Sequence, residues 1–112
     1  MVYVDDAMLP YGRMKMSHLI ATTDAELHAC AQGVGVKRKW HQAPPHHDSH
    51  YDICLGMRVK AIERGAIPIT YRQCGAMNMR RRITGELGKP EEAEQWVREY
   101  FANRRATNGN AD

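Results

Sequence analysis

The chain has 112 residues, of which 43% are hydrophobic and 26% charged, a composition typical of one folded domain and not of a disordered segment. Its three cysteines are odd in number and form no CxxC pair, which disfavours a disulfide framework and a zinc ribbon and favours a reducing cytosol. The net charge of +3 favours phosphate-bearing partners. Because we find no signal-peptide pattern and no run near the roughly 20 apolar residues of a membrane helix, we expect a cytoplasmic location and no membrane contact.

The N-terminal segment predicts two strands. Residues 2–4 (VYV) are β-branched and aromatic, and they end in Asp5 and Asp6. Residues 9–12 (LPYG) indicate a turn or loop, and residues 15–21 (KMSHLIA) indicate the second strand.

The middle of the chain predicts a helix, a strand and a loop. Thr23 and Glu26 fit a capping box, and apolar residues then continue at helical spacing until Gly33 or Gly35. Residues 36–40 (VKRKW) indicate a short basic strand. Residues 42–49 (QAPPHHDS) indicate a loop, because turn-forming residues dominate them.

The second half predicts a helix, a strand and a final helix. Asp52 is expected to cap a helix that ends at Gly65, and residues 67–71 (IPITY) indicate an edge strand. Residues 74–89 show no clear period. Pro90 begins a strongly amphipathic helix whose apolar stripe covers either the sheet or a partner subunit. The stripe consists of Ala93, Trp96, Val97, Tyr100 and Phe101.

Together these elements predict an α/β (or α+β) fold, a small mixed sheet of about four strands packed by two to three helices. The expected order is β-β-α-β-α-β-α. We divide the chain into a core domain (1–72), a basic Gly/Arg-rich connector (73–89), an amphipathic helix (90–106) and a disordered tail (107–112).

Two adjacent carboxylates, Asp5 and Asp6, are the first candidates for chemistry. They end a predicted strand, and open α/β sheets place their sites beyond such ends. Strand alternation points them to opposite sides, so a regular strand would bring only one of them into the site, whereas both could turn toward a cation if the strand ends there. The alternative is that one aspartate caps the following turn and the other is solvated. With His18 they form a candidate site for a divalent metal, Mg²⁺ or Mn²⁺.

The second candidate is His50-Tyr51-Asp52 at an expected helix start, where free N–H groups favour phosphate. His50 titrates near neutrality and is the candidate general acid or base, with Asp5 and Asp6 as its catalytic partners. Asp52 is explained more simply as a helix cap.

Five further residues are candidates for ligand binding. Guanidinium groups suit phosphate, and exposed aromatic rings suit a nucleobase. The residues are Arg13 and Arg58 for phosphate and Tyr11, Trp40 and Tyr51 for stacking. The loop histidines, His46 and His47 among them, offer a weak signal for adventitious Zn²⁺ or Ni²⁺.

These motifs together resemble an uncharacterised family, the domain of unknown function numbered 4031. The resemblance covers roughly residues 2–72 and rests on VYVDD (2–6), YGRMKMSHLIA (11–21), TDAELHA (23–29) and HYDICL with Arg58. It implies a compact stand-alone cytosolic domain carried by bacteria and phages, which would place a phage-encoded copy in the host cytoplasm. It implies no activity. Gly56 and Met57 stand where the family pattern has Ser and Lys before the arginine.

Three functions follow as hypotheses. The first is a metal-dependent phosphoester hydrolase that acts on a nucleotide or nucleic acid. The second is a non-enzymatic binder of a nucleotide or of a host protein, for example a phage-encoded sequestering or inhibitory protein. The third is a protein–protein module that forms homo-oligomers through the final helix.

Overall fold

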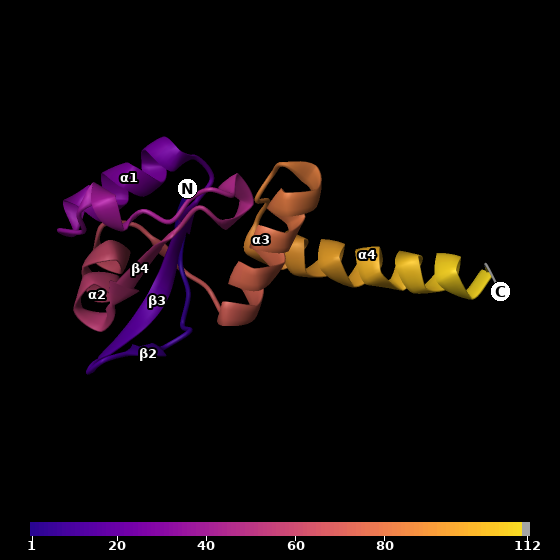
Figure 1. Ribbon diagram of the computed structural model, residues 1–112, viewed down its shortest axis with the longest axis horizontal. Coiled ribbons are helices and arrows are strands. Elements are labelled where there is room, and N and C mark those ends of the chain that lie inside the picture. The colour runs from indigo at the N-terminus through magenta and orange to yellow at the C-terminus, as the bar shows by residue number, and fades with distance from the viewer. Residues whose placement is uncertain (111–112) are drawn as a thin grey trace.

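The computed structural model describes residues 1–110 and shows a five-stranded mixed sheet packed by helices, which confirms the expected mixed α/β fold (Figure 1). No helix in this part of the chain is long and apolar enough to cross a membrane. The strands are β1 (Val2–Val4), β2 (Leu9–Tyr11), β3 (Met14–Ala21), β4 (Tyr51–Cys54) and β5 (Ile67–Pro68). The α-helices are α1 (Asp24–Gly33), α2 (Leu55–Glu63), α3 (Tyr71–Thr84) and α4 (Pro90–Asn110).

Strand β3 is the longest strand and organises the sheet. It pairs antiparallel with β1, β2 and β4, while β1 pairs in parallel with β5. Val4 lies opposite Leu19, and Leu9 lies opposite Met16. Four residues (5–8) therefore connect β1 to β2, whereas only two residues of β3 (17 and 18) lie between their partners. The chain therefore bulges out of the ladder just after Asp5, a distortion of the kind that often re-aims side chains beside functional sites.

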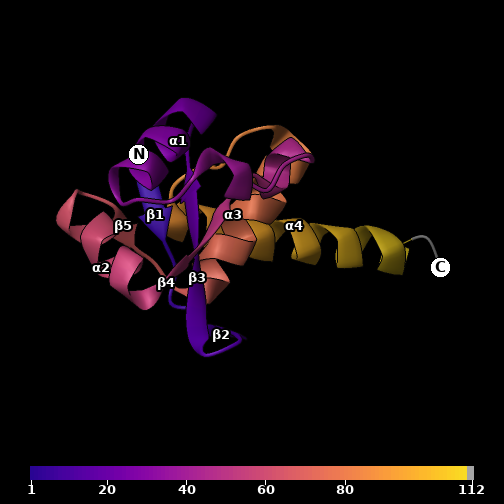
Figure 2. The same cartoon turned by 60° about the vertical axis from the view of Figure 1, so that its left-hand side comes forward.

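Strand alternation gives the sheet two different faces. On one face Val4, Leu19 and Ile53 pack beneath α1 and α2. On the other face Tyr3 and Ile20 pack beneath α3, mainly against Cys74 and Met77. Figure 2 shows α1 and α2 on one side of the strands and α3 on the other. Helix α3 covers only part of its face, so the opposite end of that face carries polar side chains.

The two C-terminal helices follow local signals. Thr70 and Gln73 form a capping box that starts α3, and Gly85 ends it with a φ of 85°, a value that favours glycine. Helix α4 packs on α3 through the buried Ala93 and then extends away from the domain as a rod (Figure 1). Trp96 and Tyr100 stack on each other at 5.2 Å between ring centroids.

The structure corrects two expectations in the middle of the chain. Residues 36–40 form no strand: Arg38–Trp40 is a 3₁₀ turn whose side chains are exposed, and pairing beside β4 begins after it, at the bridge between Gln42 and His50. Asp52 is not a helix cap, because it lies within β4 and the following helix begins at Leu55. A second 3₁₀ turn, His46–Asp48, lies in the expected loop.

Other boundaries also differ from those expected. Leu9–Tyr11 is a strand, and the turn of its hairpin with β3 follows it. Strand β5 has only two residues, because Tyr71 already starts α3. Residues 73–89, expected to be a connector, include most of α3. Helix α4, expected to end at residue 106, continues to Asn110. Residues 111–112 of the expected tail lie outside the described part.

Candidate functional site

A row of polar side chains crosses three neighbouring strands on the face that α3 leaves open. His18 lies opposite Asp52 in the β3–β4 ladder, and the backbone N–H of Asp5 donates to the His18 carbonyl at 3.0 Å. Because Tyr3 and Ile20 face α3, alternation also places Asp5, His18 and Asp52 on that face. His50, two residues before Asp52, adds a second imidazole at the end of the row.

Asp5 is fully buried and fixes His18 from behind. One of its carboxylate oxygens accepts the backbone N–H of His18 at 2.7 Å and that of Ala7 at 3.2 Å. The other oxygen accepts from Nδ1 of His18 at 2.7 Å. Burial raises the pKa of Asp5, but the hydrogen bonds from His18 outweigh it and leave the pKa below its ordinary value. The same bond to Asp5 raises the pKa of His18.

The two imidazoles converge on one carboxylate oxygen. Oδ1 of Asp52 lies 3.8 Å from Nε2 of His18 and 3.5 Å from Nε2 of His50. Nδ1 of His50 lies 2.5 Å from the backbone carbonyl of Asp48, and Nε2 of Gln42 donates to Oδ2 of Asp52 at 2.7 Å. Pairing with His50 lowers the pKa of Asp52. Burial lowers the pKa of His50, but its bonds to Asp52 and Asp48 outweigh burial and raise it.

These three side chains have the geometry of metal ligands. One ligand atom from each of His18, His50 and Asp52 lies within 4.8 Å of the others. Two ligands of a tetrahedral zinc ion, each about 2.0–2.1 Å from the metal, are about 3.3 Å apart. The measured 3.5 and 3.8 Å therefore need only small adjustments. Both histidines also have the outer partner common at metal sites, because the far ring nitrogen is held by a carboxylate or a backbone carbonyl.

Three other residues border the row without joining the histidine cluster. Tyr71, the first residue of α3, stacks on His18 at 6.2 Å between ring centroids. Nε of Arg58 donates to the backbone carbonyl of Asp5 at 2.8 Å. Cys74 lies beside Asp5 and His18, but burial, with a smaller effect from Asp5, raises the pKa of its thiol to about 12. A thiol that stays protonated is a poor metal ligand.

The two adjacent aspartates have separate places. Asp5 points into the row, whereas Asp6 is exposed and its Oδ1 accepts the backbone N–H of Tyr71 at 2.7 Å. Asp6 thus helps to cap α3 and does not face His18. The structure therefore brings Asp5, His18 and His50 together but leaves Asp6 outside.

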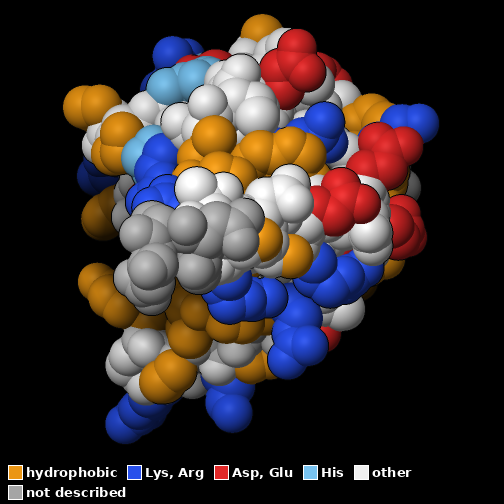
Figure 3. Space-filling model, turned by 90° about the vertical axis from the view of Figure 1, so that its right-hand side faces the viewer, with side chains coloured by type: hydrophobic (Ala, Val, Ile, Leu, Met, Phe, Trp, Pro, Cys, Tyr) orange, Lys and Arg blue, Asp and Glu red, His pale blue; other side chains and the backbone are white. Residues whose placement is uncertain are grey.

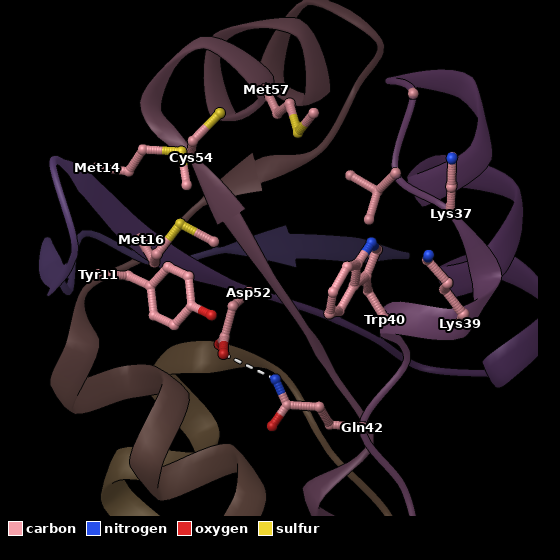
Figure 4. A pocket seen from close by; sticks show the side chains of 12 residues that line it. Tyr11, Met14, Met16, Lys37, Lys39, Trp40, Gln42, Asp52, Cys54 and Met57 are labelled. Carbon is pink, nitrogen blue, oxygen red and sulfur yellow. Dashed lines mark hydrogen bonds between the residues drawn. The ribbon is translucent and has the colours of Figure 1, made fainter.

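A cavity of about 520 Å³ opens beside the row, and Asp52 lines both (Figure 4). Tyr11 and Trp40 lie on either side of Asp52, which is tied to Gln42 by the hydrogen bond drawn there. The first 3₁₀ turn and the residue before it contribute two cationic side chains, and the opposite wall is apolar and sulfur-rich. These groups are Lys37 and Lys39 on one side and Met14, Met16, Cys54 and Met57 on the other.

The remaining sequence candidates lie elsewhere. Arg13 is exposed in the turn of the β2–β3 hairpin. Tyr51 is 1% exposed and belongs to the core beneath α1 and α2, so its ring is not open to a ligand in the row. Sequence reasoning missed Asp52 as a member of the site, although a strand interpretation of residues 50–54 would have placed it beside His50.

The face of the molecule seen along α4 does not gather positive charge into one patch. On the face seen along α4, Lys and Arg side chains form several separate groups, and acidic side chains gather on one side (Figure 3). A nucleic-acid duplex usually meets a continuous basic patch or stripe. This face is therefore poorly suited to a long nucleic acid.

The comparisons with known proteins give one result. A family model, "Protein of unknown function (DUF4031)", matches residues 2–81, which include every strand and helices α1 and α2 together with most of α3. No curated protein and no solved structure matches the chain. Helix α4 lies outside the matched residues. Since the match covers well over half of its length, the chain belongs to the DUF4031 family.

Proposed function

We propose that the protein is a metal-dependent hydrolase of a phosphate-containing small molecule, with the metal ion bound by His18, His50 and Asp52. One observation carries the proposal: the Nε2 atoms of both histidines lie within 4 Å of the same carboxylate oxygen of Asp52. Two histidines and one carboxylate leave coordination positions open for water and substrate, as in hydrolytic zinc sites.

The donor set favours a transition metal over magnesium. Mg²⁺ prefers oxygen ligands and retains several waters, whereas imidazole nitrogens suit Zn²⁺ and neighbouring transition metals. Because Asp6 lies outside the row and Asp5 is fully buried behind His18, neither is placed to supply the carboxylate oxygens of the Mg²⁺ or Mn²⁺ site expected from Asp5, Asp6 and His18. We therefore expect Zn²⁺ or Mn²⁺ to bind and Mg²⁺ to bind weakly.

The residues in and around the row have different roles in this proposal. Asp5 and the carbonyl of Asp48 hold the two imidazoles in place, and Gln42 orients Asp52. A bound divalent ion would supply a water of lowered pKa as the nucleophile. His50, the general base expected from the sequence, serves in this arrangement as a ligand.

The cavity supports a phosphate-containing substrate, and a nucleotide in particular. Lys37 and Lys39 offer positive charge to phosphate, while Trp40 and Tyr11 offer aromatic faces to a base. The cavity lies within the usual volume range of small-molecule sites. Because Asp52 belongs to both the cavity and the metal-binding row, a phosphoester held in the cavity would lie beside the bound ion.

The test combines metal binding with turnover. Untagged protein stripped with EDTA is titrated with Zn²⁺ and Mn²⁺ and assayed with bis(p-nitrophenyl) phosphate and a panel of nucleotides. We expect metal-dependent product, loss of more than 100-fold in H50A, and unchanged activity in H47A, a matched variant of a histidine outside the row. D5N is expected to weaken metal binding by about 10- to 100-fold, because Asp5 only positions His18.

Two results would contradict this proposal. One is unchanged metal affinity in both H18A and H50A, provided that circular dichroism shows both variants folded. The other is metal binding at the row with no hydrolysis of any phosphoester in the panel.

The cavity alone supports a second candidate function, a non-enzymatic nucleotide binder. The exposed Trp40 ring and the two lysines form a site that needs no metal. In a W96F background Trp40 is the only tryptophan, so titration with AMP or ATP reports directly on the cavity. Stoichiometric quenching in EDTA, with the nucleotide recovered intact after denaturation, would favour the binder over the hydrolase.

A further inference from the structure

A second cluster of ligand-type side chains lies around Tyr51, on the side of the sheet that α1 covers. Asp24, His28 and His41 each place one ligand atom within 4.8 Å of the others, and all three side chains are partly buried. Asp24 and His28 are four residues apart on α1, so they share one face of the helix. His41 comes from the segment after the first 3₁₀ turn.

Two buried hydroxyl groups orient the histidines. Nδ1 of His28 lies 2.7 Å from the hydroxyl of Tyr51, and Nε2 of His41 lies 2.8 Å from Oγ of Ser49. Ser49 is fully buried and Tyr51 is 1% exposed, so neither hydroxyl exchanges freely with solvent. Within residues 1–110 the other nitrogen of each ring has no hydrogen-bond partner.

The Ser49 hydroxyl fixes the tautomer of His41. Its single proton is donated to Oδ1 of Asp24 at 2.7 Å, since an ionised carboxylate can only accept. Oγ of Ser49 must therefore accept from Nε2 of His41, which leaves Nδ1 of a neutral His41 unprotonated. This is the form in which an imidazole binds a metal.

The neighbours of His28 act in the same direction. Burial, followed by the charges of Arg38 and His41, lowers the pKa of His28, which favours the uncharged ring that a metal requires. Asp24 contributes the negative charge, and the exposed His46 has its Nδ1 3.8 Å from Oδ2 of Asp24. The cluster thus holds three groups suited to a metal and a fourth within reach.

We propose that Asp24, His28 and His41 form a second transition-metal site, structural in role and selective for Zn²⁺, with His46 as its fourth ligand. Three histidines and one carboxylate complete a tetrahedral shell without a water, which is typical of a closed structural site. The ion would tie residues 41–49 to α1. This segment leads directly into His50, so the second site would stabilise the row without taking part in its chemistry.

The experiment counts metal ions in the untagged full-length protein. The protein is stripped with a chelator, dialysed against Zn²⁺, and measured by mass spectrometry of the metal and by calorimetry. We expect two equivalents in wild type and H47A, one in D24N and in H41N, and one in H18A. Co²⁺ in place of Zn²⁺ should give the intense visible absorption of tetrahedral coordination, and D24N and H18A should each lose the part that comes from the site they remove.

A milder variant guards against loss of folding. Y51F removes only the hydroxyl that holds His28, and we expect it to weaken the second site by about 10- to 100-fold while the row keeps its affinity. The proposal fails if D24N, H41N and Y51F all bind as much Zn²⁺ as wild type with the same affinity. It also fails if wild type binds one equivalent that H18A abolishes. One equivalent that survives in H18A would support this site and count against the metal of the row.

Discussion

Arg81 offers the sharpest test of how this fold holds its site. Its side chain is 4% exposed and reaches from α3 to the segment that leads into His50. Nε and Nη2 donate to the carbonyl of His47 at 3.0 and 2.8 Å, and Nη2 also reaches the carbonyl of Ser49 at 3.3 Å. Nη1 donates to the carbonyl of Ala21 at the end of β3. The perturbation is R81M, which keeps much of the volume but removes every donor.

The expected cost follows from these bonds. A hydrogen bond from a charged group contributes about 1.5–3 kcal/mol, and a buried carbonyl left without a donor costs about 1–3 kcal/mol. Arg81 makes two short bonds and three longer ones, the longest to Oδ1 of Asn78 at 3.5 Å, and the bonds to the His47 carbonyl are only partly buried. Allowing for the apolar contacts of methionine, we expect R81M to lose about 3–5 kcal/mol of unfolding free energy. R82M, at the exposed neighbour, should lose no more than about 0.5 kcal/mol.

The assay is urea unfolding monitored by circular dichroism. Unfolding free energies are compared between variants whose dependence on urea concentration (the m-value) is the same. Domains of this size are typically stable by about 5–15 kcal/mol, so the expected loss is large but measurable. Because Arg81 anchors the segment that carries Asp48 and His50, R81M should also weaken Zn²⁺ binding by the row. If R81M and R82M unfold at the same urea concentration, the reasoning about this anchor is wrong.

Two further predictions concern the thiols and the last helix. Because burial raises the pKa of Cys74 to about 12, iodoacetamide at pH 8 should alkylate Cys54 well before Cys74, which should react only in urea; equal native rates by mass spectrometry would contradict this. Beyond its contact with α3, helix α4 presents stacked aromatics and the 44% exposed Phe101, so we expect self-association through this end. The double variant Y100E/F101E should then sediment as a monomer, and the expectation fails if wild type is monomeric at the same concentration.

The sequence predicted the elements whose signals are local. Strand β1, the core of β3, the start of α1 at Thr23 and the start of α4 at Pro90 all follow from period or capping. Helix α3 was missed, because its buried face includes Arg81, and a buried arginine breaks the apolar period. In a sequence this arginine is indistinguishable from the surface charge of its neighbours.

The candidate site was predictable in part. Asp5, His18 and His50 were singled out by residue type, and the structure places them in one row, although sequence alone cannot give the register that joins them. Asp52 was interpreted as a cap, because an aspartate before an apolar run usually starts a helix. Pairing with β3 overrode that local preference and turned the residue toward His18.

The double position of Asp52 has one more consequence. One of its oxygens faces the histidines, and the other is held by Gln42 at the wall of the cavity. A cation on one side and a small molecule on the other would thus share a single carboxylate. By thermodynamic linkage, if the bound cation changes the affinity of the cavity for its ligand by some factor, the bound ligand must change the affinity for the cation by the same factor. The two sites would then act as one sensor of both occupants.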